Sequence, residues 1–128
     1  MPSAAPSFPG LRVLLAEDNW SIALTMSTML EDWGCTVVSV AADCASAEDL
    51  AATADADCAV LDIELLDGLC YSAAERAAAR GMAVIFTSGY DTPPDLPPAL
   101  RDTPWLVKPV APAHLQRALQ SLLETRNA

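Results

Sequence analysis

The chain has 128 residues, of which 52% are hydrophobic and 19% charged, and its formal net charge at pH 7 is −10. At about 100–200 residues per domain, this length predicts one domain without an attached output domain. The hydrophobic content supports a buried core and argues against general disorder. The negative charge repels phosphate backbones and anionic lipid headgroups, which argues against binding to nucleic acids or membrane surfaces.

The N-terminal segment, residues 1–10, has no basic residue and no apolar block. It therefore lacks the features of a secretory signal, and we expect a flexible leader before a domain at residues 11–126. The apolar runs of the chain are far shorter than the about 20 residues that a membrane-spanning helix needs. These features predict a cytoplasmic protein.

The sequence contains four widely spaced cysteines. No two of them form a C-x-x-C pair, and no histidine lies near enough to complete a zinc site. Reduced, mostly buried thiols are therefore expected. The four residues are Cys35, Cys44, Cys58 and Cys70.

The first elements predicted along the chain are a strand and a helix. Residues 11–16 form a nearly continuous apolar run, which is typical of a strand covered on both faces. Asn19 can cap the helix that follows, and Gly34 can end it. The apolar residues between them recur at helical spacing and predict one stripe that packs on the sheet: Ile22, Met26, Met29, Leu30 and Trp33.

The middle of the chain continues this alternation of strands and helices. Residues 36–40 predict a second strand because they are rich in β-branched side chains. An alanine-rich second helix is expected at residues 46–54, with Asp43 or Ser46 near its start. The apolar run at residues 58–62 predicts a third strand.

A loop through residues 67–68 separates the third strand from another alanine-rich helix, which is expected to end at residues 80–81. Residues 82–88 form the most strongly predicted strand of the chain. The connection at residues 91–102 contains four prolines. Any fourth helix must therefore be short and start at Pro97 or Pro98, where the missing N–H group costs least.

The C-terminal part predicts a last strand at residues 105–108 and a closing helix at residues 112–125. The alternation of five strands with helices requires crossover connections between parallel strands. The sequence therefore predicts an α/β domain with a parallel sheet and helices on both of its faces.

Polar residues stand where the apolar strand runs stop. Glu17 and Asp18 follow the first run, while Asp62, Ser88 and Lys108 end the third, fourth and fifth runs. The carboxyl ends of parallel strands share one edge of a sheet, so these groups should meet in one pocket. Neighbouring carboxylates repel each other by roughly 3 kcal/mol per pair at an effective dielectric constant near 20, so the cluster needs a cation. Oxygen ligands suit Mg²⁺, and Lys108, the only lysine in the sequence, adds a positive charge.

At these residues the sequence resembles the receiver domain of response regulators in two-component signalling, over residues 11–123. The resemblance rests on the ordered set Leu14-Leu-Ala-Glu-Asp-Asn19, Val60-Leu-Asp-Ile63, Phe86-Thr-Ser-Gly-Tyr90 and Leu106-Val-Lys-Pro109. It implies a flavodoxin-like fold: a doubly wound, five-stranded parallel sheet in the order 2-1-3-4-5, with helices on both faces and a short fourth helix.

The resemblance also implies roles for the clustered residues. Asp62 would accept the phosphoryl group, and Lys108 would pair with that group. Asp18 and Asp62 would bind Mg²⁺ directly, Glu17 would act through a water molecule, and the backbone carbonyl of Glu64 would complete the protein ligands.

The family also has a switch hydroxyl that hydrogen-bonds the phosphoryl group. Ser88 and the adjacent Thr87 are both candidates, and Ser88 is preferred because the family places a small residue next, as Gly89 does here. Trp105 stands where the family has a bulky residue that repacks when the hydroxyl moves. An ordinary half-buried tryptophan is the alternative interpretation of Trp105.

Two further positions are those that the family uses to tune the lifetime of the phosphoryl group. They are Glu64, two residues after Asp62, and Tyr90, two residues after Ser88. The loop after the third strand departs from the family pattern, because Leu66 replaces the usual proline and the following glycine comes two residues early.

The resemblance implies a single-domain response regulator that takes its phosphoryl group from a histidine kinase or a histidine phosphotransfer protein. It would signal by contact with a downstream protein or by onward transfer, with no catalysis beyond its own phosphorylation and dephosphorylation. One alternative is a receiver-like interaction module without phosphoryl turnover. Another is a small Mg²⁺-dependent phosphohydrolase, which would require an aspartate where this chain has Glu64.

Overall fold

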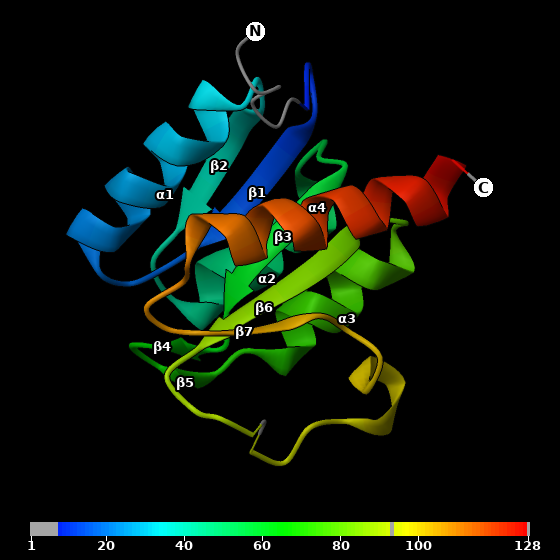
Figure 1. The fold of residues 1–128 in the computed structure, drawn as a ribbon. Helices are drawn as coiled ribbons and strands as arrows, with labels where there is room; N and C mark the ends of the chain where they lie inside the picture. The colour runs from blue at the N-terminus through cyan, green and yellow to red at the C-terminus, as the bar shows by residue number, and fades with distance from the viewer. Residues whose placement is uncertain (1–7, 93, 128) are drawn as a thin grey trace, which may run out of the picture.

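A computed structural model describes residues 8–92 and 94–127 of the chain (Figure 1). Its main sheet consists of β1 (Arg12–Ala16), β2 (Thr36–Ala41), β3 (Cys58–Asp62), β6 (Ala83–Ser88) and β7 (Trp105–Val107). The helices are α1 (Trp20–Asp32), α2 (Cys44–Thr53), α3 (Tyr71–Ala79) and α4 (Pro112–Asn127), with a short 3₁₀ turn, η1 (Pro98–Leu100). A two-stranded hairpin, β4 (Glu64–Leu65) and β5 (Gly68–Leu69), follows β3.

All neighbouring strands of the main sheet are parallel, in the order β2-β1-β3-β6-β7. This confirms the predicted doubly wound sheet in the order 2-1-3-4-5, because β6 and β7 are the fourth and fifth strands of that prediction. The register aligns the carboxyl ends of the central strands, since Ala16 pairs with Leu61, Asp62 with Thr87, and Ser88 with Val107. The residues at these ends therefore lie along one edge of the sheet.

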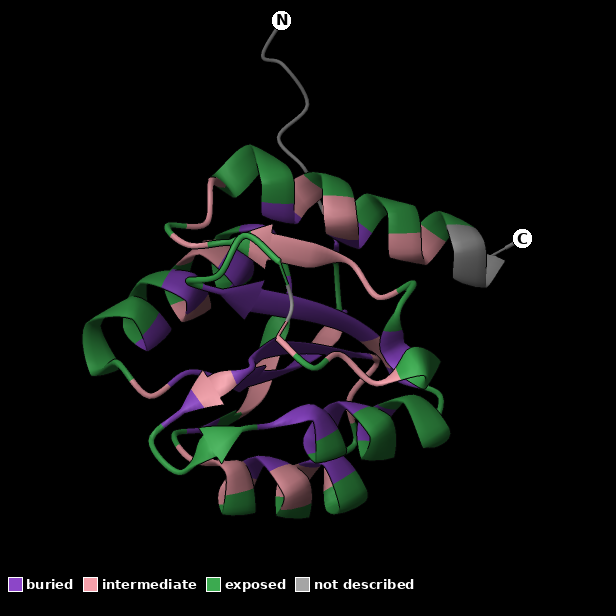
Figure 2. Cartoon of the chain, turned by 90° about the horizontal axis from the view of Figure 1, so that it is seen from below, coloured by how far each residue is buried: buried purple, intermediate pink, exposed green. Residues whose placement is uncertain are grey.

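Helices cover both faces of the sheet, with α1 and α4 on one face and α2 and α3 on the other (Figure 1). Figure 2 shows the buried strands of the sheet between helices on its two faces. Every residue of β3 is buried, as expected for a central strand between two helical layers. Its side chains alternate between the two cores: Val60 packs with the α1 and α4 side, and Leu61 with the α2 and α3 side.

The expected leader at residues 1–10 falls mainly on residues outside the described part of the chain. Phe8, however, is buried and packs edge-on against Trp33, with 6.2 Å between the ring centroids. The Phe8 amide also donates to the Trp33 carbonyl at 2.7 Å. The core on the α1 side therefore includes a residue that lies N-terminal to the first strand.

The predicted helix starts of α1 and α2 have side-chain caps. Asn19 Oδ1 accepts a hydrogen bond from the Ile22 amide, and Asp43 Oδ1 accepts one from the Ser46 amide. Such caps satisfy amides that have no partner within the helix. Between the two alternatives for the start of α2, the structure therefore selects Asp43.

The predicted apolar stripe of α1 is only partly right. Met26, Leu30 and Trp33 are buried, but Ile22 is 38% exposed and Met29 is half-buried. Ala23 occupies the buried face instead. The short side chain of Ala23 fits on the buried face, so this face is rotated relative to the prediction, and Ile22 and Met29 lie at its border.

In the described part of the connection between β6 and β7, the only helical element is the turn η1, so the fourth helix is reduced to three residues, in line with the predicted short helix. The prolines explain this, because each one removes a backbone donor that a longer helix would need. Within the described residues, no helix is long and apolar enough to cross a bilayer.

The expectation of four reduced thiols is wrong for two of the cysteines. Cys44 and Cys70 form a disulfide whose Cα atoms are 5.3 Å apart, while Cys35 and Cys58 are buried. The bonded pair is 26 residues apart in sequence, and it meets because the β4–β5 hairpin returns the chain to the start of α2. Sequence spacing does not reveal this proximity.

Candidate phosphoryl-acceptor site

Lys108 contacts two buried carboxylates at the carboxyl edge of the sheet. Its Nζ atom lies 2.5 Å from Asp62 Oδ2 and 2.8 Å from Glu17 Oε1. Asp62 and Glu17 are 1% and 2% exposed, and the Lys108 side chain is 23% exposed. The three residues come from the ends of β3, β1 and β7, so the parallel register brings together groups that are up to 91 positions apart in the sequence.

Three acidic residues form a cluster around this lysine. Glu17, Asp18 and Asp62 each offer a carboxylate oxygen within 4.8 Å of the others. The buried Glu17 Oε1 accepts no hydrogen bond from any described residue, although it lies close to the Lys108 ammonium. An all-oxygen cluster with an unsatisfied buried oxygen fits a hard divalent cation such as Mg²⁺.

Burial and charge set the protonation of these groups in opposite directions. Burial raises the pKa of Asp62 to about 6, although contact with Lys108 opposes this shift. For Glu17, burial also disfavours the charged form, but the contact with the Lys108 ammonium and the hydrogen bond from the Asn19 amide outweigh it and lower the pKa. For Lys108, burial favours the neutral amine, and its contacts with Asp62 and Glu17 outweigh this effect and raise the pKa.

The pKa of Asp18 is also raised, first by burial and then by the neighbouring Glu17 carboxylate. The part of this shift that comes from Glu17 reflects repulsion inside an acidic cluster that one ammonium does not neutralise. A bound cation would remove that repulsion. The electrostatics and the geometry of the cluster therefore agree on a cation site.

The hydroxyl of Ser88 is bound to the carboxylate of Glu64. Ser88 Oγ donates to Glu64 Oε1 at 2.6 Å, and the Gly89 amide donates to the same oxygen at 2.8 Å. The Glu64 amide in turn donates to Asp62 Oδ1 at 2.9 Å. Glu64 thus contacts Asp62 through its backbone, while its side chain occupies two neighbouring hydrogen-bond donors.

Trp105 connects β7 to the segment that follows Ser88. Its indole Nε1 donates to the Tyr90 carbonyl at 3.0 Å, and its ring packs edge-on against Phe86 with 5.7 Å between the centroids. The Tyr90 side chain is half exposed. Any movement of the residue 88–90 segment therefore changes the surroundings of Trp105.

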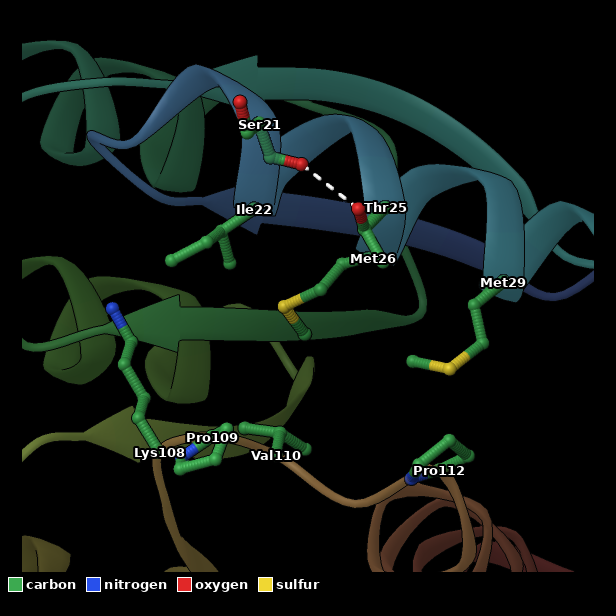
Figure 3. Close-up of a pocket in the computed structure, with 9 residues that line it drawn as sticks. All are labelled: Ser21, Ile22, Thr25, Met26, Met29, Lys108, Pro109, Val110 and Pro112. Atoms are coloured by element: carbon green, nitrogen blue, oxygen red, sulfur yellow. Dashed lines mark hydrogen bonds between the residues drawn. The ribbon is translucent and has the colours of Figure 1, made fainter.

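A mainly apolar groove of about 420 Å³ lies beside the acidic cluster, between α1 and the connection from β7 to α4 (Figure 3). Lys108 belongs to both features, because its stem lines the groove while its ammonium contacts Asp62. Sequence reasoning missed the groove, since it assigned Ile22 and Met29 to the core. The lining residues are Ser21, Ile22, Thr25, Met26, Met29, Lys108, Pro109, Val110 and Pro112.

The sequence matches the response regulator receiver domain over residues 13–120, and the chain therefore belongs to this family. A comparison with curated protein sequences finds no match. Among solved structures, the fold is similar to SdrG from Sphingomonas melonis Fr1, with 30% identity, a TM-score of 0.75, and coverage of 89% of this chain and 97% of SdrG.

Two structures of the response regulator PhyR are also similar. The PhyR protein of Brucella abortus has 25% identity and a TM-score of 0.79, with 95% of this chain covered but only 51% of PhyR. The receiver domain of Erythrobacter litoralis PhyR has 23% identity and a TM-score of 0.76, with 90% of this chain and 91% of that chain covered. The chain thus spans about half the length of the Brucella protein.

Proposed function

We propose that this receiver domain accepts a phosphoryl group on Asp62 from a histidine kinase or a histidine phosphotransfer protein in the cytoplasm. The observation that carries this proposal is the contact between the Lys108 ammonium and the buried Asp62 carboxylate, inside a cluster with two further acidic side chains. A nucleophilic carboxylate and a fixed positive charge are what in-line phosphoryl transfer requires.

In the proposed reaction, an Asp62 carboxylate oxygen attacks the phosphorus of a phosphohistidine, and the phosphorus–nitrogen bond breaks. The product is an acyl phosphate on Asp62 and a free histidine on the donor. Lys108 is already 2.5 Å from the nucleophile, so it can pair with the incoming phosphoryl oxygens. Ser88 can donate its hydroxyl to the same group once Glu64 releases it.

In this proposal, Asp18 and Asp62 would bind Mg²⁺ directly, Glu17 would act through a water molecule, and the backbone carbonyl of Glu64 would complete the protein ligands. When bound, the ion neutralises negative charge on the acidic residues and on the phosphoryl group. Glu64 and Tyr90 are proposed to set the lifetime of the acyl phosphate. Glu64 occupies the donors of Ser88 and Gly89, and Tyr90 is a half-exposed residue two positions after Ser88.

We place the phosphoryl donor on the groove between α1 and the β7–α4 connection. This surface is largely apolar, and Lys108, which lines it, also contacts Asp62. One further apolar side chain of α1, Trp20, is also exposed. A donor protein that covers this area would bring its phosphohistidine to the acidic cluster.

A second candidate function is a receiver-like module that binds a downstream protein without phosphoryl turnover. One observation favours it: the Glu64 carboxylate already binds the Ser88 hydroxyl and the Gly89 amide. A protein whose own side chain permanently fills these donors would not need a phosphoryl group. The two functions differ in whether Asp62 can be modified.

The deciding experiment incubates the protein with acetyl phosphate, with and without Mg²⁺, and measures its intact mass. We expect a Mg²⁺-dependent gain of one phosphoryl group, which Asp62→Asn abolishes because it removes the nucleophile. Asp32→Asn is the matched control, since it removes an exposed carboxylate at the far end of α1 and should be labelled normally. Absence of labelling in the wild-type protein would support the interaction module instead.

A further inference from the structure

The Cys44–Cys70 disulfide lies at the base of the β4–β5 hairpin, close to the phosphoacceptor. Cys44 is the first residue of α2, and Cys70 directly precedes α3. The Cys70 amide donates to the carbonyl of Ile63 at 2.9 Å, and Ile63 follows Asp62 in the chain. The disulfide therefore ties the segment after the phosphoacceptor to the start of a helix.

Other contacts hold the two cysteines together apart from the sulfur–sulfur bond. The Asp67 carboxylate, at the turn of the hairpin, accepts hydrogen bonds from the Cys44 amide at 2.6 Å and from the Ala45 amide at 3.4 Å. The Ser72 hydroxyl also donates to Glu48. Reduction of the disulfide does not itself break these hydrogen bonds, so the two thiols would stay near enough to be oxidised again. Hydrogen bonds alone open more readily than a covalent bond, so the hairpin would be less restrained in the reduced protein.

The two cysteines differ in how far they are buried. Cys44 is half-buried, whereas Cys70 is 1% exposed. A small thiol can therefore approach the Cys44 sulfur, which is the geometry that thiol–disulfide exchange requires. Cys35 and Cys58 are buried, so they are poorly placed for the same exchange.

The hairpin connects this disulfide to the phosphoryl site. Glu64 and Leu69 pair across the two strands, and Leu69 directly precedes Cys70. The side chain of Glu64 then accepts hydrogen bonds from Ser88 and from the Gly89 amide. Restraint at Cys70 therefore restrains the carboxylate that occupies the donors of the proposed phosphoryl site.

From these contacts we infer that Cys44 and Cys70 are a reversible dithiol–disulfide site whose oxidised form keeps Glu64 on Ser88 and Gly89 and so slows phosphorylation of Asp62. The effect on phosphorylation rests on the proposed function. In the proposed cytoplasmic location, glutathione and thioredoxin would reduce a disulfide of this kind, and disulfides in such compartments are usually transient, catalytic or redox-sensing.

Oxidation would proceed by exchange with a low-molecular-weight disulfide such as oxidised glutathione. The Cys44 thiolate attacks one sulfur of that disulfide and releases one glutathione thiolate. The Cys70 thiolate then attacks the Cys44 sulfur of the mixed disulfide and releases the second glutathione. In total the two protein thiols lose two electrons and two protons, and the two glutathione molecules gain them.

The experiment compares the protein equilibrated with oxidised glutathione and with dithiothreitol. Alkylation followed by peptide mass spectrometry should show Cys44 and Cys70 blocked in the first state and modified in the second. Hydrogen exchange of residues 63–70 should be faster after reduction, and labelling of Asp62 by acetyl phosphate and Mg²⁺ should be several-fold faster. Reoxidation of the same sample should restore both slower rates.

Cys44→Ser is the test variant, because this position is half-buried and tolerates a polar side chain better than Cys70 does. It should behave like the reduced wild-type protein at every redox condition. Cys35→Ser is the matched control and should keep the full redox response.

The inference is overturned if Cys44 and Cys70 are alkylated equally in both conditions, or if they form the bond without changing hydrogen exchange at residues 63–70 or the labelling rate. Failure of labelling in both states would reject the proposed function and the inferred effect on phosphorylation, while alkylation would still decide whether the cysteines form a reversible pair.

Discussion

Asp62 combines two properties that a phosphoacceptor needs. Its carboxylate is almost fully buried, which removes competing water, and it touches a fixed ammonium, which favours the approach of an anion. Burial is the stronger influence on its protonation and raises its pKa above the usual value of about 3.9. The Asp62 carboxyl group is therefore partly protonated in mildly acidic solution without a metal ion.

The first prediction is a titration of Asp62. Without divalent ions, the side-chain carboxyl carbon of Asp62 should titrate in ¹³C NMR with a pKa of about 6, because burial disfavours its charge. The carboxylate form dominates above this pH and the acid form below it. Mg²⁺ should move the titration to lower pH, since a cation favours the charged form. The signal should be missing in Asp62→Asn, and a pKa below 4 without metal would contradict the prediction.

Among the secondary-structure elements, the strands are the most predictable from the sequence. Their apolar runs mark buried positions, and the predicted boundaries differ from the observed ones by one residue at most. The polar residues that end these runs followed from the same pattern. The sequence pattern alone therefore predicts that Glu17, Asp62, Ser88 and Lys108 lie at one edge of the sheet.

The features that sequence reasoning missed depend on contacts between elements. The β4–β5 hairpin has strands of two residues, which are too short to show an alternating pattern. The disulfide follows from the path of that hairpin. The groove follows from the rotation of α1, which a helical periodicity of about 3.6 residues defines only to within one position.

The groove leads to a prediction for α1. Ile22→Asp places a charge on the apolar lining, so phosphotransfer from a phosphorylated histidine donor protein should slow at least several-fold. Labelling by acetyl phosphate should stay near the wild-type rate, because this small donor does not need the groove. Leu24→Asp changes an exposed apolar residue of α1 that does not line the groove, and it should have a smaller effect.

Rapid-quench measurements with both phosphoryl donors would separate docking from chemistry. Equal slowing of both donors in Ile22→Asp would show that the substitution damages the acidic cluster itself. Equal transfer from the protein donor in Ile22→Asp and the wild-type protein would reject the groove as the docking surface.

For the whole molecule, the net charge of −10 and the acidic cluster act in the same direction. Folding must bring Glu17, Asp18 and Asp62 together in a chain that is already strongly negative. Part of the repulsion is offset by Lys108, and a divalent ion would offset more. Stability should therefore depend on the type of cation and not only on ionic strength.

The corresponding prediction concerns thermal unfolding. Mg²⁺ at about 100 times its dissociation constant should add about 2.7 kcal/mol to the free energy of unfolding, because it binds the folded state. NaCl at the same ionic strength should add less, since it only screens charge. Asp18→Asn should lose most of the Mg²⁺-specific increase, which calorimetry can measure. An equal response of the wild-type protein to both salts would argue against a built cation site.

The sheet keeps the groove and the disulfide on separate sides of the molecule. The groove belongs to the layer of α1 and α4, whereas the disulfide joins the start of α2 to the segment before α3, in the opposite layer. Both reach the same edge, one through Lys108 and the other through Glu64. A bound protein and a small redox agent could therefore act at the same time without competing for surface. The phosphorylation of Asp62 would then depend on both.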